Sequence, residues 1–411
     1  MNQKKTGLFG SWPNFSHEEA NKAKEILLTN KVNYWTGEEC RKFEEEFAEY
    51  VHCKYAVATS NGTTALDLAF KAINLDEGSE VLVTSRTFLA SVSSIINAGL
   101  VPKFIDVSRD TQNIDVSKIE NEITIKTKAI VCVHLAGWPC DMDEIMSIAN
   151  LHNLFVIEDC AQAHGAKYKG RPLGSIGQIG CWSFCQDKIM TTAGEGGMVA
   201  TNNEEYWNKM WSYKDHGKSY DAVYNTNHNP GFKWLHDSLG TNWRMTEIQG
   251  AIGRIQLKKM DSWSATRNEY LAKIWKTCSH IDALRVPKFK CLSCSKCNED
   301  NACIHGAYKC YVFLDYSKIR PEWSRLNIID RINSAGVPCF VGSCSEVYLE
   351  KAFESLDCRP KHRLPIAKEL GETALMFLIH PSLSNQDIDF TCKVIKDTFE
   401  AISLPVFNST S

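Results

Sequence analysis

Apolar and polar positions along the first 260 residues alternate between two patterns, one typical of helices and one typical of buried strands. Within residues 38–51, Phe43, Phe47, Tyr50 and Val51 share one helical face, which predicts a helix. Short, unbroken apolar runs then alternate with helix-like stretches; the runs span residues 55–59, 81–83, 104–105, 129–133 and 154–157. Strands that are apolar throughout and alternate with helices are typical of a mostly parallel sheet covered on both faces. The predicted fold class is therefore α/β.

The second part of the chain has its own apolar stripe. From Arg244 onward, Met245, Ile248, Ile252 and Ile255 predict a long helix that leads into a second lobe. A chain of 411 residues exceeds the size at which single cores stop growing. We expect a large domain over residues 1–258 and a smaller α+β domain over residues 259–411, with an insertion near 289–304.

Composition and charge narrow the functional classes. A net charge of −3 without blocks of like charge gives no footprint for nucleic acid. The first 14 residues lack the apolar core of a signal peptide, and no apolar run is long enough to cross a bilayer, so we expect a cytoplasmic protein that does not enter the membrane. The 17 cysteines are odd in number and spread along the chain, which favours reduced thiols.

Polar residues follow the predicted strands where ligands of parallel sheets bind. Residues 60–64 follow the first strand, residues 84–88 the second, His134 the run ending at Val133, and Asp159 the run ending at Ile157. In the first group, Gly62 allows close approach, and Thr63 and Thr64 add hydroxyls at a helix start. These are the components of a phosphate site, although an ordinary turn capped by Thr63 has the same residues.

Lys188 lies in a loop of small residues that ends in Gly194-Glu195-Gly196-Gly197. An acid at the end of a buried strand, here Asp159, and an amine in such a loop meet the needs of pyridoxal phosphate (PLP): a carboxylate for the ring nitrogen and an amine for the aldehyde. Gln162 could then meet the phenolic oxygen of the ring. Taken singly, each has a plainer explanation, such as a surface lysine or a helix-capping aspartate. The three together favour a PLP site.

These motifs resemble those of the DegT/StrS family, the PLP-dependent sugar aminotransferases with the aspartate aminotransferase fold. The similarity is nearly continuous from Trp35 to Leu257. The sequence stretches that carry it are Ser60-Asn61-Gly62-Thr63-Thr64-Ala65-Leu66, Glu158 to Gly165, Ser183-Phe184 with Lys188, and Gly194 to Gly197.

The resemblance implies a role for each matching residue. Lys188 would hold PLP as a Schiff base, and Asp159 would pair with the pyridine nitrogen; these are the expected catalytic residues. The expected cofactor contacts also include Gln162 at the phenolic oxygen, Phe88 against the ring face, and Gly62, Thr63, Thr64 and Ser183 around the phosphate. The segment from Gly240 to Gln249 is similar to a family motif whose asparagine reaches the phosphate across a dimer interface, so Asn242 is expected to come from the second subunit.

The expected activity follows from the same resemblance. Relatives with His in place of Lys188 are sugar dehydratases, so Lys188 favours transamination. We expect a homodimer that moves an amino group from L-glutamate to a keto-sugar, nucleotide-linked, for surface polysaccharide or lipopolysaccharide. The alternatives are a keto-sugar acid without a nucleotide, such as an 8-keto-octulosonate, and a non-catalytic sugar or cofactor sensor.

Three features depart from the family pattern. Cys291, Cys294, Cys297 and Cys303 have a C-x2-C-x2-C-x5-C spacing that can hold zinc or an iron–sulfur cluster, yet it does not closely match common zinc sites; metal binding there is left open, and no metal ligand is assigned. Residues 341–346 replace a Tyr-x-Pro-x-His stretch. Arg86 is either a contact for an anionic substrate or an exposed loop arginine.

Overall fold

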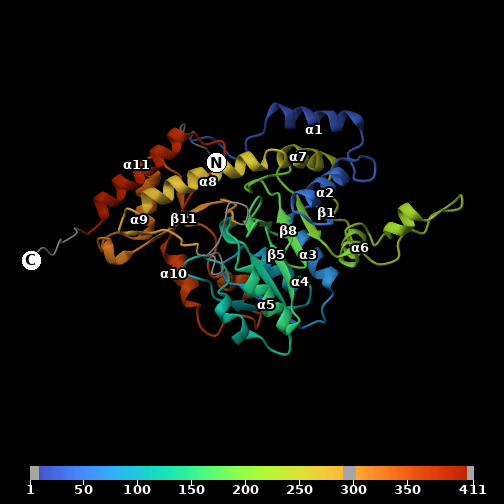
Figure 1. Cartoon of the computed structure of the whole chain (residues 1–411), viewed down its shortest axis with the longest axis horizontal. Helices are drawn as coiled ribbons and strands as arrows, with labels where there is room; N and C mark the ends of the chain where they lie inside the picture. The colour runs from blue at the N-terminus through green and yellow to red at the C-terminus, as the bar shows by residue number, and fades with distance from the viewer. Residues whose placement is uncertain (1–8, 290–301, 405–411) are drawn as a thin grey trace, which may run out of the picture.

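A seven-stranded sheet dominates the structure, a computed structural model that describes residues 9–289 and 302–404 (Figure 1). The strand order is β1-β9-β8-β5-β4-β2-β3. In this sheet β9 runs in the direction opposite to the other six strands. The α/β fold class with a mostly parallel sheet is thus confirmed. The strand bounds are β1 Tyr55–Thr59, β2 Glu80–Thr84, β3 Val101–Ile105, β4 Thr127–Val133, β5 Phe155–Asp159, β8 Ile179–Ser183 and β9 Gly197–Thr201.

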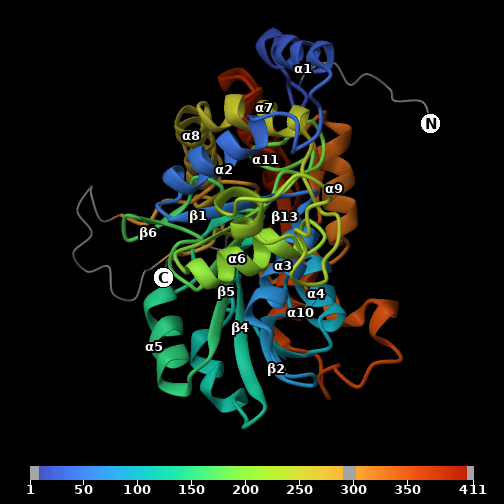
Figure 2. The ribbon, with the colours of Figure 1, turned by 90° about the vertical axis from the view of Figure 1, so that its right-hand side faces the viewer.

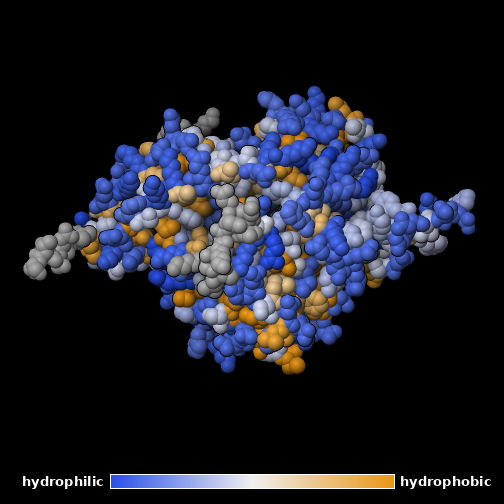
Figure 3. Space-filling model, in the orientation of Figure 1, coloured by the Kyte–Doolittle hydropathy of each residue, from blue (hydrophilic) through white to orange (hydrophobic). Residues whose placement is uncertain are grey.

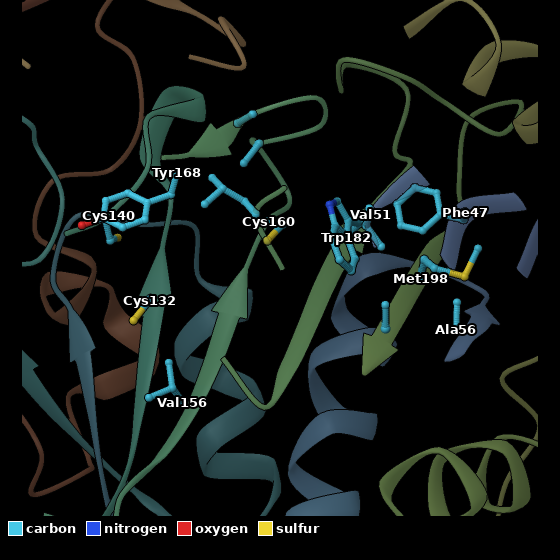
Figure 4. Close-up of a cluster of buried hydrophobic side chains, with 14 of the residues drawn as sticks. Phe47, Val51, Ala56, Cys132, Cys140, Val156, Cys160, Tyr168, Trp182 and Met198 are labelled. Atoms are coloured by element: carbon cyan, nitrogen blue, oxygen red, sulfur yellow. The ribbon is translucent and has the colours of Figure 1, made fainter. Parts of the chain in front are cut away.

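Each central strand sends alternate side chains into two different cores. In β2, Leu82 joins one core while Val81 and Val83 join the other, as expected for a side-chain period of two. The first core packs against α2 (Glu39–Tyr50), α5 (Met142–His152) and α7 (Glu247–Leu257), and Figure 4 shows its part around Trp182. The second packs against α3 (Gly62–Ile73), α4 (Ala90–Asn97) and α6 (Glu204–Tyr213); Figure 2 shows α5 and α4 on opposite sides of the strands. Apolar helices on both faces explain why the strands are mostly apolar.

A second, four-stranded sheet forms the core of the C-terminal part. Its order is β10-β11-β13-β12, with β10 Leu284–Arg285, β11 Cys310–Leu314, β12 Cys339–Phe340 and β13 Ala374–Phe377. Residues of α8 (Met260–Cys278), α9 (Arg325–Ser334) and α11 (Asn385–Ile402) pack against this sheet in one core, and α10 (Pro365–Thr373) contributes to another. The predicted domain boundary near residue 259 stays a prediction; α8 begins beside it.

The long helix predicted from Arg244 onward is wrong in its bounds. Helix α7 begins only at Glu247, because Thr246 and Gln249 form a capping box that fixes the first turn. Backbone angles of −91° and −9° at Lys259 separate α7 from α8, and α8 carries the chain into the second sheet. The buried face of α7 includes Gly253, where a Cβ would lie 2.6 Å from the ring of Phe43. Close packing on a glycine cannot be predicted from the spacing of large apolar residues.

Residues 217–240, called the arm below, project from the body after α6 (Figure 1). Three of its apolar side chains are almost fully exposed: Phe232 by 80%, Trp234 by 83% and Leu239 by 93%. Figure 3 shows the same segment standing out from a mostly hydrophilic face. The remaining described α-helix is α1 (His17–Thr29), which packs on α7. No described helix combines the length and apolarity that a bilayer span requires.

A buried ion pair joins α2 to the base of the arm. The Glu44 carboxylate accepts hydrogen bonds from Lys214 Nζ at 3.1 Å, Ala58 N at 2.8 Å and Tyr34 Oη at 2.9 Å. The Lys214 ammonium, which is fully buried, also lies 3.7 Å from the centroid of the Tyr34 ring. Both charges are thus satisfied away from water.

Replacing Lys214 with Met should destabilise the protein by about 3–5 kcal/mol, because Glu44 would be left as a buried, unpaired charge. Urea unfolding followed by tryptophan fluorescence measures the change. Lys209→Met on the same helix is the matched control, since its ion pair with Glu205 is exposed and should contribute less than about 1 kcal/mol. Equal effects of the two substitutions would contradict the expectation.

Candidate active site

A cavity of about 800 Å³ lies at the carboxyl ends of the parallel strands. Its floor consists of residues that end or follow β1, β2, β4, β5 and β8, and its far wall comes from the C-terminal part of the chain. The floor includes Asn61–Thr64, Thr87, Phe88, Ser91, Val133, Asp159, Gln162, Ser183 and Lys188; the wall includes Tyr308, Lys309, Tyr311, Gly342, Ser343 and Cys344.

Eight of the nine predicted site residues line this cavity. They are Gly62, Thr63, Thr64, Phe88, Asp159, Gln162, Ser183 and Lys188. Phe88 is 68% exposed, with room for a partner against its ring. Asn242 does not line the cavity of its own chain; it is exposed and forms a backbone bridge with Asp215.

The first turn of α3 is built as an anion site. Asn61 is the N-cap, and its side chain accepts a hydrogen bond from Thr64 N at 2.9 Å. Thr64 Oγ1 donates to the carbonyl of Asn61 at 2.8 Å, whereas the Thr63 hydroxyl has no hydrogen bond within residues 9–289 and 302–404. The first N–H groups of a helix lack partners inside the helix and carry the positive end of its dipole. This turn can therefore bind a phosphate group.

Gly62 brings this turn against the end of β8. A Cβ on Gly62 would lie 2.5 Å from Cβ of Ser183, which is below any real contact distance. The Ser183 hydroxyl accepts a hydrogen bond from Cys185 N at 3.3 Å and lines the same cavity. The glycine thus places the hydroxyl of Ser183 beside the helix start.

Asp159 is buried at the end of β5 and held by two donors. Ser91 Oγ donates to one carboxylate oxygen at 2.6 Å, and Ala161 N donates to the other at 3.1 Å. Thr87 Oγ1 lies 2.7 Å from Ser91 Oγ and extends the chain of hydroxyls. A carboxylate fixed in this way at the cavity floor can hold a cationic nitrogen of a ligand.

Gln162 is fixed in the orientation that leaves its amide to donate. Its Oε1 accepts a hydrogen bond from Ala136 N at 2.8 Å. The side chain is buried and lines the cavity. Its remaining donor capacity suits an anionic or phenolic oxygen.

Lys188 lies beside an aromatic ring and an acid that the sequence patterns did not single out. Its Nζ is 5.1 Å from the centroid of the Tyr308 ring, and it forms no hydrogen bond or ion pair with a described residue. The Tyr308 hydroxyl donates to Asp187. Burial acts to raise the pKa of Asp187, but the Lys188 charge and this hydroxyl lower it below its ordinary value. Trp12 Nε1 also donates to the carbonyl of Lys188 at 2.8 Å, which steadies the loop.

Ser91, Tyr308, Asp187 and Ala136 are the residues that sequence reasoning missed in this site. Tyr308 lies far along the chain from Lys188, and the sequence motifs described above do not include it. Asp187 directly precedes Lys188, and this adjacency is the sequence feature from which its place in the site could have been predicted. Ser91 and Ala136 contact Asp159 and Gln162 through the tertiary fold, and their spacing in the sequence does not predict these contacts.

Arg86 is neither an exposed loop residue nor part of the cavity lining. It is fully buried, and none of its three guanidinium nitrogens has a hydrogen-bond partner among the described residues. Its guanidinium carbon lies 5.4 Å from the ring centroid of Tyr311, a wall residue, so its charge lies behind the wall. The reading of Arg86 as an exposed arginine is therefore wrong, because both lobes enclose it.

Most of the cysteine motif lies outside the described residues. Cys291, Cys294 and Cys297 belong to residues 290–301, and the Sγ of Cys303 accepts a hydrogen bond from Lys169 N at 3.3 Å. Elsewhere, His134, Glu158 and Cys160 place ligand-type atoms within 4.8 Å of one another. The Glu158 carboxylate, however, already accepts hydrogen bonds from three backbone N–H groups, of Gly174, Ile176 and Gly177. This cluster is therefore explained by its structural role.

Comparisons with known proteins find similarity to aminotransferases. The model of the DegT/DnrJ/EryC1/StrS aminotransferase family matches residues 13–396. The solved structure of an aminotransferase from Psychrobacter cryohalolentis is 56% identical, covers 96% of this chain and 99% of its own, and superposes with a TM-score of 0.92. The GDP-perosamine synthase of Escherichia coli O157:H7 is 36% identical over 90% of this chain and 92% of its own length. The spore coat polysaccharide biosynthesis protein SpsC of Bacillus subtilis is 32% identical over 94% and 96%.

Gly62→Ala should lower the free energy of unfolding by about 1–3 kcal/mol, because the new methyl group overpacks against Ser183. Thermal or urea unfolding measures this. Thr63→Ala is the control: its hydroxyl has no partner in the described chain, so its removal should change stability by no more than about 0.5 kcal/mol. A neutral Gly62→Ala would show that the turn is not in contact with β8.

Proposed function

The chain belongs to the DegT/DnrJ/EryC1/StrS aminotransferase family, and from that membership we propose that it uses PLP to transfer an amino group from L-glutamate to a keto-sugar. The observation that carries the proposal is that Lys188 and Asp159 line one cavity together with the N-terminus of α3. An amine, a buried carboxylate and an anion site in one cavity are the three groups that PLP requires.

The residues present fit PLP. The phosphate would bind the first turn of α3, where Thr63 keeps an unused hydroxyl and Ser183 is held close by Gly62. Asp159 is positioned to bond the ring nitrogen, since Ser91 and Ala161 N hold its carboxylate in place. Gln162 would donate to the phenolic oxygen, because its carbonyl oxygen already accepts from Ala136 N. Phe88, largely exposed in the cavity, would cover a ring face.

Bound PLP would supply an aldehyde that condenses with amines and a ring that accepts electrons. Lys188 Nζ would first hold the aldehyde and, once displaced by the donor, take the proton from the donor's α carbon. No ion pair with a described residue ties up this amine, so it can change partners during turnover. The Asp159 carboxylate would keep a proton on the ring nitrogen, and the Tyr308–Asp187 pair would hold the lysine over the cavity.

We propose that the acceptor is a nucleotide-linked keto-sugar. This rests on relatives: GDP-perosamine synthase bears a nucleotide sugar in its name, and SpsC takes part, by name, in making a polysaccharide. The product would enter a surface polysaccharide or lipopolysaccharide. The cytoplasmic location expected from the sequence stays a prediction.

We further propose a homodimer in which Asn242 completes the partner's site. Asn242 is exposed and does not line its own cavity, which is expected of a residue that acts in another subunit. The arm just before it exposes Phe232, Trp234 and Leu239, an arrangement more typical of an interface than of a free surface.

The test of the cofactor and its lysine is Lys188→Ala. Wild-type protein purified with PLP should carry the cofactor covalently after borohydride reduction, on the peptide that contains Lys188, and mass spectrometry reads this directly. The variant should lose both the linkage and turnover, whereas Lys276→Ala, an exposed lysine on α8, should keep both. PLP on another lysine, or none on wild type, would contradict the assignment.

Acceptor class is tested with the same preparation. With L-glutamate as donor, nucleotide-linked keto-sugars should be aminated, and an 8-keto-octulosonate should not. Amination of the free keto-sugar acid alone would replace the proposed acceptor with the alternative one.

Coexpression of Lys188→Ala chains with Asn242→Ala chains tests the shared site. If Asn242 acts across the interface, a mixed dimer has one site with neither change, so random pairing of equal amounts should restore about a quarter of wild-type activity. Each variant alone should be impaired, because both of its sites carry the change. No recovery in verified mixed dimers would show that Asn242 acts within its own chain, and full activity of Asn242→Ala alone would show that it has no role.

A further inference from the structure

A second amine, that of Lys309, lines the active-site cavity near Lys188. Lys309 directly precedes β11, and its Nζ lies 4.6 Å from the centroid of the Tyr308 ring. The Nζ of Lys188 lies 5.1 Å from the same centroid, so both amines are near one ring. Within the described residues, Lys309 Nζ forms no hydrogen bond or ion pair, and nothing in the proposed reaction uses it.

The surroundings of Lys309 contain more positive than negative charge. Arg267 on α8 is fully buried, and within the described part of the chain its hydrogen bonds are long ones, from Nη1 to the carbonyls of Ala307 at 3.4 Å and Ile379 at 3.5 Å. Arg86, behind Tyr311, has no acceptor in the described chain. Among the residues that the structure describes, the carboxylate whose charge acts on Lys309 is that of Asp187, which also binds the Tyr308 hydroxyl and interacts with Lys188.

A buried cation without a partner is costly, and a wall with several of them is complementary to an anion. Burial lowers the pKa of Lys309 to about 8, with Arg267 and Lys188 contributing and Asp187 opposing. The amine therefore remains mostly charged at neutral pH and open to the cavity. These are the properties of an anion-binding residue.

We propose that Lys309 binds the α-carboxylate of the amino donor, an inference that rests on the proposed aminotransferase function. In an amino acid, the carboxylate is attached to the same carbon as the reacting nitrogen. A cation that shares an aromatic ring with Lys188 is therefore placed for that carboxylate, whereas the diphosphate of a nucleotide sugar lies several bonds from its keto carbon. Lys309 thus determines donor recognition and leaves acceptor recognition to other residues.

The two half-reactions of a ping-pong enzyme separate donor from acceptor. Lys309→Met should raise the L-glutamate concentration that half-saturates the first half-reaction by about tenfold to hundredfold, as expected for a lost charge-assisted bond. Spectral conversion of the bound cofactor measures it. The second half-reaction, with the keto-sugar alone, should keep its half-saturating concentration. Lys309→Arg should recover most of the donor binding, and Lys276→Met is the control for a surface lysine.

Glutarate, a dicarboxylate without an amine, provides a readout that does not depend on turnover. Calorimetry should detect its binding to wild type and Lys309→Arg, and at least tenfold weaker binding to Lys309→Met. The charged form of Lys309 binds the carboxylate, so wild-type affinity should fall as the pH rises through about 8. It should not fall in that way in Lys309→Arg, where the side chain stays charged. Asp187, Lys188, Tyr308, Arg267 and His380 surround Lys309 in both proteins and are thereby controlled.

The proposal is overturned if Lys309→Met leaves both glutarate affinity and the glutamate dependence unchanged, or if its effect is confined to the keto-sugar half-reaction. Failure of the aminotransferase function would look different. Wild type itself would then show no spectral conversion with glutamate, whatever the variants do.

Discussion

The parallel pairing of β2, β4, β5 and β8 is the constraint on which the site depends. Parallel strands end at the same edge, and neighbours lie about 4.8 Å apart, so loops distant in sequence are forced together there. Asp159 and Ser183 occupy the ends of adjacent strands, and the first turn of α3 reaches them because Gly62 has no side chain. The positions of Asp159, the Lys188 loop and the first turn of α3 are therefore consequences of one hydrogen-bonding pattern.

The sequence predicts this half of the molecule well because its signals are local. Apolar runs such as 129–133 mark the strands, and the polar residues after each run mark the cavity floor. The far wall was not predictable in the same way. Tyr308 and Lys309 directly precede β11 of the second sheet, and their position depends on how the two sheets dock rather than on any spacing. The burial of Arg86 has the same origin, since the segment that encloses it lies more than 200 residues away.

The starts of helices are only partly predictable from the sequence. Asn61 caps α3, two residues before the Thr63 that the sequence suggests as a cap, and the stripe from Arg244 suggests a start of α7 that is too early. Thr246 and Gln249 determine the actual start, and the buried face of α7 relies on glycines that leave no apolar signal. Residue 242 thereby stays outside the helix and in the extended stretch that follows the arm.

The hydrogen bond from Trp12 Nε1 to the carbonyl of Lys188 connects the Lys188 loop to a residue near the start of the described chain. The indole of Trp12 also stacks on His380 and meets Trp263 edge to face. A ribosome makes Lys188 long before it makes His380, so the loop is synthesised well ahead of the residues that support it. Vectorial synthesis thus separates the synthesis of the large sheet from the completion of the contacts that support the Lys188 loop.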